Sequence, residues 1–110
     1  NCYPFWEGYS IDESIHVIQK MYALVKEKSD GKRVLISETG WPTAGNKNGS
    51  AEPSLTNMMK YFTNLYTWSA ANDIDIFYFS SFDESWKFSY EGEAGASWGI
   101  WNSKNELKIK

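Results

Sequence analysis

Short apolar segments alternate with segments of helical periodicity along this chain, and the alternation limits which folds it can form. Residues 10–31 and 54–71 carry apolar side chains every three to four positions, which predicts two amphipathic helices. Residues 33–37 and 74–82 are rich in β-branched and aromatic side chains, which predicts two strands, the second covered on both faces. Residues 1–5 are predicted to end a further extended segment, because their third residue precedes a proline.

Strands separated by helices are expected to pair in parallel, because each helix carries the chain back to the edge where the preceding strand began. The predicted fold class is therefore α/β. Three parallel strands would leave two unpaired edges and sheet faces that are only partly covered. We therefore expect residues 1–110 to form part of a larger parallel structure, completed by further polypeptide or by a second copy.

The boundaries of the predicted elements have local signals. Ser10 and Glu13 have the spacing of a capping box, and Gly31 can adopt the left-handed conformation that ends a helix. Residues 43–53 are rich in Gly, Asn, Ser and Pro, which predicts a long connection. The remaining C-terminal residues, 83–110, are predicted to be mostly loop.

Composition and charge exclude several classes of partner. The 110 residues include 14 acidic and 11 basic side chains, a formal charge of −3 without a dense basic block, so no nucleic-acid partner is expected. No apolar run reaches the roughly 18 residues needed to cross a bilayer, so no membrane partner is expected. With one cysteine and one histidine the chain offers no ligand cluster for a metal, and we expect no cofactor.

Two glutamates follow predicted strands at the ends where parallel α/β folds bind ligands. Glu38 ends the strand predicted at 33–37, and side-chain alternation places it on the face of Val34 and Ile36. Glu84 follows the last predicted strand in the same way. The chain also contains six tryptophans, more than a small core can enclose, and flat aromatic rings can serve as binding surfaces. Two carboxylates among aromatic rings indicate sugar chemistry.

Four motifs make the chain recognisable. They are YPFW at 3–6, VLISETGWPTAGN at 34–46, FSSFDESWK at 79–87 and SWGIW at 97–101. In order and spacing they resemble the signature of glycoside hydrolase family 17, the β-1,3-glucanases and glucanosyltransferases. The resemblance implies that residues 1–110 are the C-terminal portion of a catalytic (β/α)8 (TIM) barrel, about its last three strand-helix units, with parallel strands.

The resemblance also implies roles for single residues. Glu38 takes the place of the nucleophile in a retaining mechanism that acts on β-1,3-glucan, by hydrolysis or by transfer to another sugar. Glu84 and Lys87 match the acidic and basic residues after the eighth strand that help to arrange the catalytic site. The family often has one more acid before the late Trp-Gly, which is either Glu91 or Glu93. The predicted substrate-binding residues are Tyr3, Phe5, Trp6, Trp41, Trp86 and Glu93.

One feature of the family is missing from these residues. The family supplies its general acid from an Asn-Glu pair that ends the fourth strand, whereas the pair in this chain, at 105–106, lies in the C-terminal tail. The 110 residues alone are therefore expected to be inactive and to need the N-terminal part of the barrel or a second copy. The resemblance implies a secreted protein, in the cell wall, outside the cell or in the periplasm.

Two other functions stay open at this level. A carbohydrate-binding module would use the tryptophans without catalysis, although it would not need a carboxylate at the end of an apolar strand. A non-catalytic half-barrel that associates with itself would cover its open sheet edges in a dimer. Single residues also have structural alternatives: Trp41 could pack beneath its loop, and Glu84 with Lys87 could form a surface ion pair.

Overall fold

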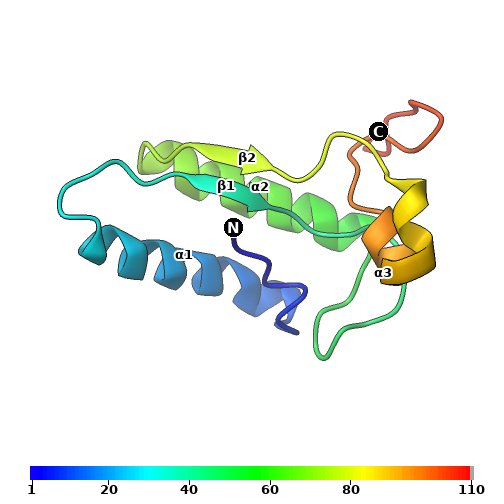
Figure 1. The fold of residues 1–110 in the computed structure, drawn as a ribbon, viewed down its shortest axis with the longest axis horizontal. Coiled ribbons are helices and arrows are strands. Elements are labelled where there is room, and N and C mark those ends of the chain that lie inside the picture. The colour runs from blue at the N-terminus through cyan, green and yellow to red at the C-terminus, as the bar shows by residue number, and fades with distance from the viewer. Residues whose placement is uncertain (110) are drawn as a thin grey trace.

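The computed structural model describes residues 1–109, which form two long helices, two short strands and two further short helices. In chain order the elements are α1 (Ile11–Lys28), β1 (Ile36–Thr39), α2 (Leu55–Ala71), β2 (Ile76–Tyr78), the 3-10 helix η1 (Ser85–Lys87) and α3 (Phe88–Ala96). β1 and β2 pair in parallel. Figure 1 shows α1 and α2 running beside this sheet, with both strands directed toward the end of the molecule that holds α3. The predicted α/β class and parallel pairing are confirmed.

Local capping explains where the two long helices begin. The Ser10 hydroxyl accepts a hydrogen bond from the Glu13 amide (3.3 Å), and the Glu13 carboxylate accepts one from the Ser10 amide (3.2 Å). This reciprocal pair confirms the predicted capping box. Ser54 caps α2 by accepting the amide of Asn57 (3.0 Å). α1 ends shortly before Gly31, whose φ of +76° is the predicted left-handed conformation.

The hydrophobic core anchors the turn that follows Glu38. The hydroxyls of Thr39 and Tyr61 lie 2.6 Å apart within the core, so these buried polar atoms satisfy each other. Trp41 donates its Nε1–H to the carbonyl of Glu52 (2.9 Å). The largest fully buried side chains include Trp41, Tyr61, Phe5, Ile18, Met58 and Leu65.

The strands are shorter than predicted. The strand expected at 33–37 corresponds to β1, which begins three residues later, at Ile36. The strand expected at 74–82 corresponds to β2, which is regular only from Ile76 to Tyr78. Pairing starts where a partner is available, with Ile36 opposite Ile76. The Phe77 side chain is 64% exposed, so the prediction that this strand is covered on both faces is wrong. A sheet of two strands leaves that face open.

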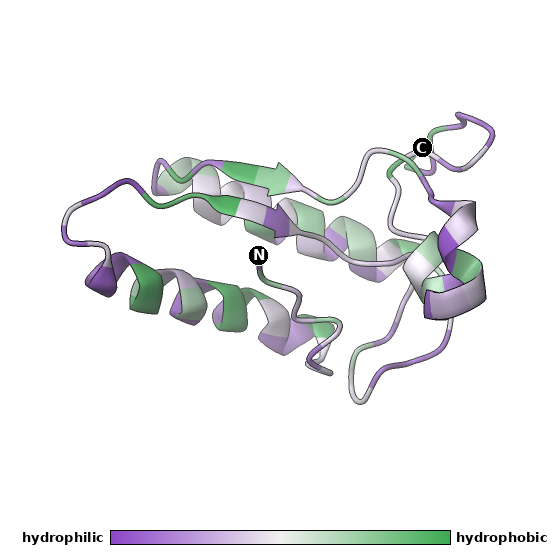
Figure 2. Cartoon of the chain, viewed as in Figure 1, coloured by the Kyte–Doolittle hydropathy of each residue, from purple (hydrophilic) through white to green (hydrophobic). Residues whose placement is uncertain are grey.

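A shift of register interrupts the side-chain alternation of β1. Ile36 lies opposite Ile76, whereas Thr39 lies opposite Tyr78, so β1 uses one more residue than β2 over the same span. Ile36 and Thr39 are both buried, and Glu38 between them is partly exposed. Exposure therefore alternates as predicted as far as Glu38, and the alternation breaks at Thr39. The strand brings Glu38 to its carboxyl end. Figure 2 shows β1 changing from hydrophobic to hydrophilic toward that end.

Two further segments differ from expectation. Residues 1–5 form no regular strand; a turn starts at Pro4, although the Cys2 amide donates to the Glu38 carbonyl (3.0 Å) as a neighbouring strand would. α3 lies within the region predicted to be mostly loop. Its helical signal is weak because Gly92 interrupts it with non-helical angles (φ 71°, ψ −170°). The expected unit of three strands thus contains two in residues 1–109.

Candidate active site

Glu38 lies at the carboxyl end of β1, where the N-terminal segment meets the strand. The Tyr3 hydroxyl and the Asn1 side-chain amide both donate hydrogen bonds to its Oε2, the latter at 3.1 Å. The Glu38 carbonyl accepts the Cys2 amide at 3.0 Å, which aligns the two segments. The YPFW and ETGWP motifs, which are distant in the sequence, therefore meet in space.

Tyr3 connects several charged groups of the site. Its ring packs edge-on against Trp98, with centroids 5.5 Å apart. Burial, the hydrogen bond to Glu38 and the charges of Glu38, Glu91 and Glu84 raise the pKa of the Tyr3 phenol well above its ordinary value. Tyr3 therefore stays protonated near neutral pH and can act only as a neutral hydrogen-bond donor toward the carboxylate.

Glu84 and Lys87 form a partly buried ion pair next to Tyr3. Lys87 Nζ lies 2.9 Å from Glu84 Oε1, and the side chains of Lys87 and Glu84 are 15% and 26% exposed. The ammonium also lies 4.7 Å from the ring centroid of Phe79, whose ring packs edge-on against Tyr3 at 6.2 Å. The structure thus brings the predicted catalytic residues Glu38, Glu84 and Lys87 into one site.

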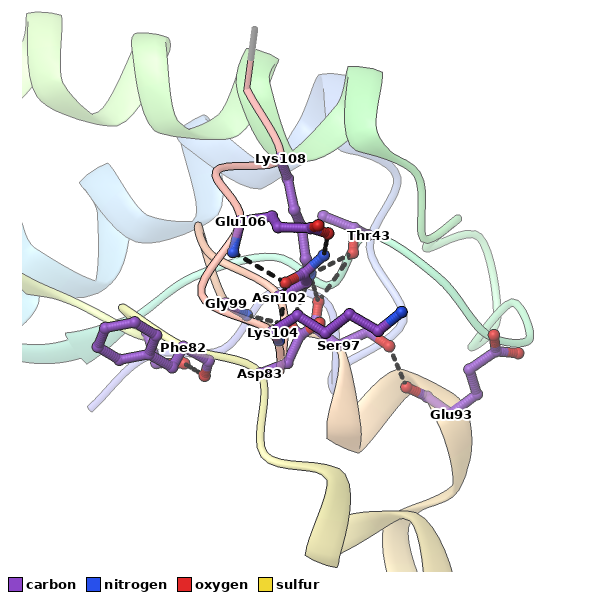
Figure 3. Close-up of polar contacts among 11 residues, drawn as sticks. Thr43, Phe82, Asp83, Glu93, Ser97, Gly99, Asn102, Lys104, Glu106 and Lys108 are labelled. Carbon is purple, nitrogen blue, oxygen red and sulfur yellow. Dashed lines mark hydrogen bonds and ion pairs between the residues drawn. The ribbon is translucent and has the colours of Figure 1, made fainter.

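Of the two acids that the sequence leaves open, Glu91 is close enough to Tyr3 to act on it electrostatically. Its carboxylate is one of the charges that raise the pKa of Tyr3. The Glu91 side chain lies over Gly95 of the same helix, because a Cβ atom on Gly95 would fall 2.6 Å from Glu91 Oε2. Glu93 is exposed, its backbone carbonyl accepts the Ser97 hydroxyl (2.7 Å), and Figure 3 shows its carboxylate directed away from the neighbouring polar contacts. Glu91 is therefore the acid that acts on Tyr3, whereas both acids are exposed and both line one pocket with Trp6.

The aromatic residues predicted to contact a sugar differ in how exposed their side chains are. Trp6 (42% exposed) and Trp86 (63%) present ring surface that could stack on a sugar. Phe5 and Trp41 are fully buried, so neither ring offers a face to a substrate, and the prediction that they contact sugar is corrected. Phe5 packs edge-on against Trp6 (5.1 Å) and against Trp41 (5.4 Å). It therefore supports the exposed Trp6 ring from inside the core.

Sequence interpretation misses Phe79, whose ring contacts both Tyr3 and Lys87. Its signal in the sequence is its place as the first residue of the motif at 79–87. An aromatic residue in an apolar strand is more often part of a core, so that place alone does not distinguish it.

Known proteins share both the sequence and the fold of this chain. A model of the BtgE/BtgC glycoside hydrolase domain matches residues 1–99. The chain belongs to this family. The resemblance to glycoside hydrolase family 17 is also confirmed: a family 17 β-1,3-glucanosyltransferase from Rhizomucor miehei matches with a TM-score of 0.90 and 38% identity. An active-site mutant of that enzyme in complex with laminaritriose matches with a TM-score of 0.90 and 37% identity.

The BtgE/BtgC-type segment matches only part of each relative. The match to the R. miehei structures includes 99% of the residues of this chain and 40% of the residues of each R. miehei chain. A glucan 1,3-beta-glucosidase of Arthroderma benhamiae is 29% identical over 99% of this chain and 40% of its own length. The cell surface mannoprotein MP65 of Candida albicans is 30% identical over 94% of this chain and 27% of its own length. The chain thus spans 40% or less of the length of these relatives.

Two kinds of feature are absent from residues 1–109 of the BtgE/BtgC-type segment. In this range no group of three or more His, Cys, Asp or Glu side chains is arranged to hold a metal ion. Over the same residues no helix is both long enough and apolar enough to cross a membrane.

Proposed function

We propose that residues 1–110 form the C-terminal part of the (β/α)8 barrel of a retaining enzyme that acts on β-1,3-glucan, with Glu38 as its nucleophile. The observation that carries this proposal is the hydrogen bond from Tyr3 to Glu38 Oε2 at the carboxyl end of a parallel strand. The family match and the printed activities of the relatives support the same chemistry.

The hydrogen bonds leave one oxygen of the nucleophile for the reaction. Among residues 1–109, both bonds to the Glu38 carboxylate go to Oε2, so Oε1 attacks the anomeric carbon. As this C–O bond forms, the bond to the leaving glucan breaks and the leaving oxygen takes a proton from a general acid. Water or the hydroxyl of a second glucan then displaces Glu38 and returns a proton to that acid. Two inversions give net retention of the anomeric configuration.

Tyr3 and the ion pair of Glu84 with Lys87 position the reacting carboxylate. A neutral donor on Oε2 fixes the orientation of Glu38 and stabilises the negative charge that returns when the glycosyl-enzyme is cleaved. The Lys87 ammonium offsets part of the repulsion between Glu84 and the other carboxylates around Tyr3.

The general acid is proposed to come from outside these residues. A retaining mechanism needs a second carboxyl group about 5 Å from the nucleophile. No Asn-Glu pair precedes Glu38 in the sequence, and Glu84 is already paired with Lys87. We propose that the other part of the barrel supplies the acid, from the same polypeptide or from a second copy. Residues 1–110 alone are then inactive.

The proposed substrate is a β-1,3-glucan chain that stacks on Trp6 and Trp86. The exposure of these two rings supports this assignment, as does the laminaritriose bound to the R. miehei enzyme. We propose a secreted protein that acts outside the cell or in the cell wall. The similarity to a cell surface mannoprotein supports that location.

Turnover of laminarin by the full-length protein tests the proposal. Glu38→Gln keeps the shape of the side chain and removes its nucleophilicity, so product release should fall by several orders of magnitude with an unchanged circular dichroism spectrum. Glu52→Gln changes an exposed glutamate and should leave turnover unchanged. Trp6→Ala should weaken binding of laminarin oligosaccharides. Wild-type turnover in Glu38→Gln would refute the proposed function.

A further inference from the structure

A second polar cluster is made of Thr43, Asp83, Ser97 and Lys108 (Figure 3). Lys108 Nζ donates to Asp83 Oδ1 (2.5 Å) and to Thr43 Oγ1 (2.9 Å). It also lies 3.4 Å from the Ser97 carbonyl oxygen. The side chains of Lys108 and Asp83 are only 14% and 17% exposed. The cluster therefore contains a mostly buried ion pair whose charges are held by further hydrogen bonds.

The Lys108 cluster joins the two segments that carry the catalytic candidates. Thr43 follows Glu38 in the same motif, and Asp83 immediately precedes Glu84. One ammonium group therefore bonds to both segments at once. The Ser97 carbonyl also accepts the Thr43 amide at 3.0 Å, which adds a third segment to the same junction.

The C-terminal segment folds back to bring Lys108 to this junction. Oδ1 of Asn102 accepts the amides of Lys104 (2.9 Å) and Glu106 (3.0 Å), so the asparagine side chain forms the turn. The Lys108 amide then donates to the Ile100 carbonyl (2.9 Å). The family model matches residues 1–99, so this turn and Lys108 lie beyond the matched region.

Close backbone packing fixes the position of Asp83. The Gly99 amide donates to Asp83 Oδ1 (2.9 Å), and a methyl group on Gly99 would fall 2.1 Å from the Asp83 nitrogen. The Asp83 amide donates to the Trp101 carbonyl (2.9 Å). Because both the side chain and the backbone of Asp83 are held, a shift of the Lys108 cluster would move Glu84 directly.

We propose that Lys108 is a positioning residue, which fixes the separation between the segment after Glu38 and the segment that carries Glu84 and Lys87. This inference rests on the proposed function of those residues. Misplacing a reacting group by about 1 Å can lower a rate roughly 100-fold. Loss of the Lys108 cluster should therefore lower kcat, whereas KM should stay near the wild-type value because the bonds of Lys108 go to Thr43, Asp83 and Ser97 and not to the rings proposed to bind glucan.

Variants of the full-length protein test this role on laminarin. Lys108→Met removes the ammonium group and should lower kcat about 100-fold with KM unchanged. Thr43→Val keeps the ion pair and removes one hydroxyl, so it should lower kcat by about 2- to 10-fold. Lys104→Met removes the same charge from the same segment and should leave kcat unchanged. Wild-type kcat in both Lys108→Met and Thr43→Val, or an effect on KM alone, would overturn the proposal.

Amide hydrogen exchange separates this proposal from the proposed function. In Lys108→Met the amides of Asp83 and Glu84 should exchange faster than in the wild type, whereas those of α1 should not change. Wild-type exchange at both amides would overturn the positioning role. A wild-type protein that does not turn over laminarin would refute the proposed function, and exchange would still decide the role of Lys108. If Lys108→Met does not fold, kcat and amide exchange are both measured on Thr43→Val instead.

Discussion

The Tyr3 hydroxyl donates a hydrogen bond to Oε2 of Glu38 from a segment distant in the sequence. Tyr3→Phe keeps the ring packed against Trp98 and removes only this donor. A hydrogen bond to a charged group contributes about 1.5–3 kcal/mol, so kcat on laminarin should fall roughly 10- to 100-fold. Tyr9→Phe, at an exposed tyrosine, is the matched control and should keep the wild-type kcat. Equal kcat in the two variants would show that the hydrogen bond has no catalytic role.

Lys87 is expected to matter more for activity than an exposed lysine does. Lys87→Met leaves Glu84 without its partner next to two other carboxylates that act on Tyr3. Since removing a group that stabilises charge in an active site costs about 100-fold or more, kcat should fall by that order. Lys28→Met breaks an exposed pair with Glu27, with side chains 81% and 67% exposed, and should change neither kcat nor melting temperature. A lower melting temperature with wild-type kcat in Lys87→Met would mean that the pair only stabilises the fold.

Gly40, which follows the end of β1, allows the chain to approach Phe79, which follows the end of β2. A methyl group at this position would fall 1.8 Å from the carbonyl oxygen of Phe79. Gly40→Ala should therefore lower the free energy of unfolding by about 1–3 kcal/mol and also lower kcat, because both strands must shift. Gly31→Ala introduces left-handed strain of about 1–2 kcal/mol far from the site and should leave kcat unchanged. Thermal unfolding and laminarin kinetics on both variants check this contrast.

The thiol of Cys2 gives a pH-dependent prediction. Burial, with a smaller contribution from Glu7, raises the pKa of Cys2 from 9.0 to about 11. The folded state therefore holds this proton more tightly than the unfolded state, so the resulting stability is complete below pH 9 and is lost as the pH rises toward 11. At pH 9 alkylation of Cys2 by iodoacetamide should be about 50-fold slower in the native protein than in urea, because the thiolate fraction differs by that factor. Mass spectrometry of the peptide that carries Cys2 measures both rates, and equal rates would contradict the burial of this thiol.

The helices were predictable because their signals are local. The bonds that Ser10 exchanges with Glu13 depend on residues within one turn, and the sequence shows them directly. The strand ends were not predictable in the same way, because a strand extends only where a neighbour supplies hydrogen bonds. The register shift between Ile36 and Thr39 likewise depends on β2, so side-chain counting along β1 could not reveal it.

The candidate site was predictable in its motifs and less so in its geometry. Motif spacing selected Glu38, Glu84 and Lys87 as candidates, but it could not choose between the acids at 91 and 93. Gly92 between these two acids has non-helical angles, and only Glu91 is among the charges that raise the pKa of Tyr3. That effect depends on how the chain folds around Tyr3, which motif spacing does not contain. Burial of the Trp41 ring also depends on contacts from distant residues, so a tryptophan in a sugar-enzyme motif proved to be core.

Trapping the glycosyl-enzyme tests most directly whether Glu38 is the nucleophile. A 2-deoxy-2-fluoro-laminaribiosyl fluoride should react with the full-length protein to form an ester that breaks down slowly, since the fluorine destabilises the oxocarbenium-like transition state. Proteolysis and mass spectrometry then locate the sugar. We predict an adduct on the carboxylate of Glu38 and none in Glu38→Gln. An adduct on Glu84 or Glu91, or turnover with inverted anomeric configuration and no adduct, would contradict the assignment.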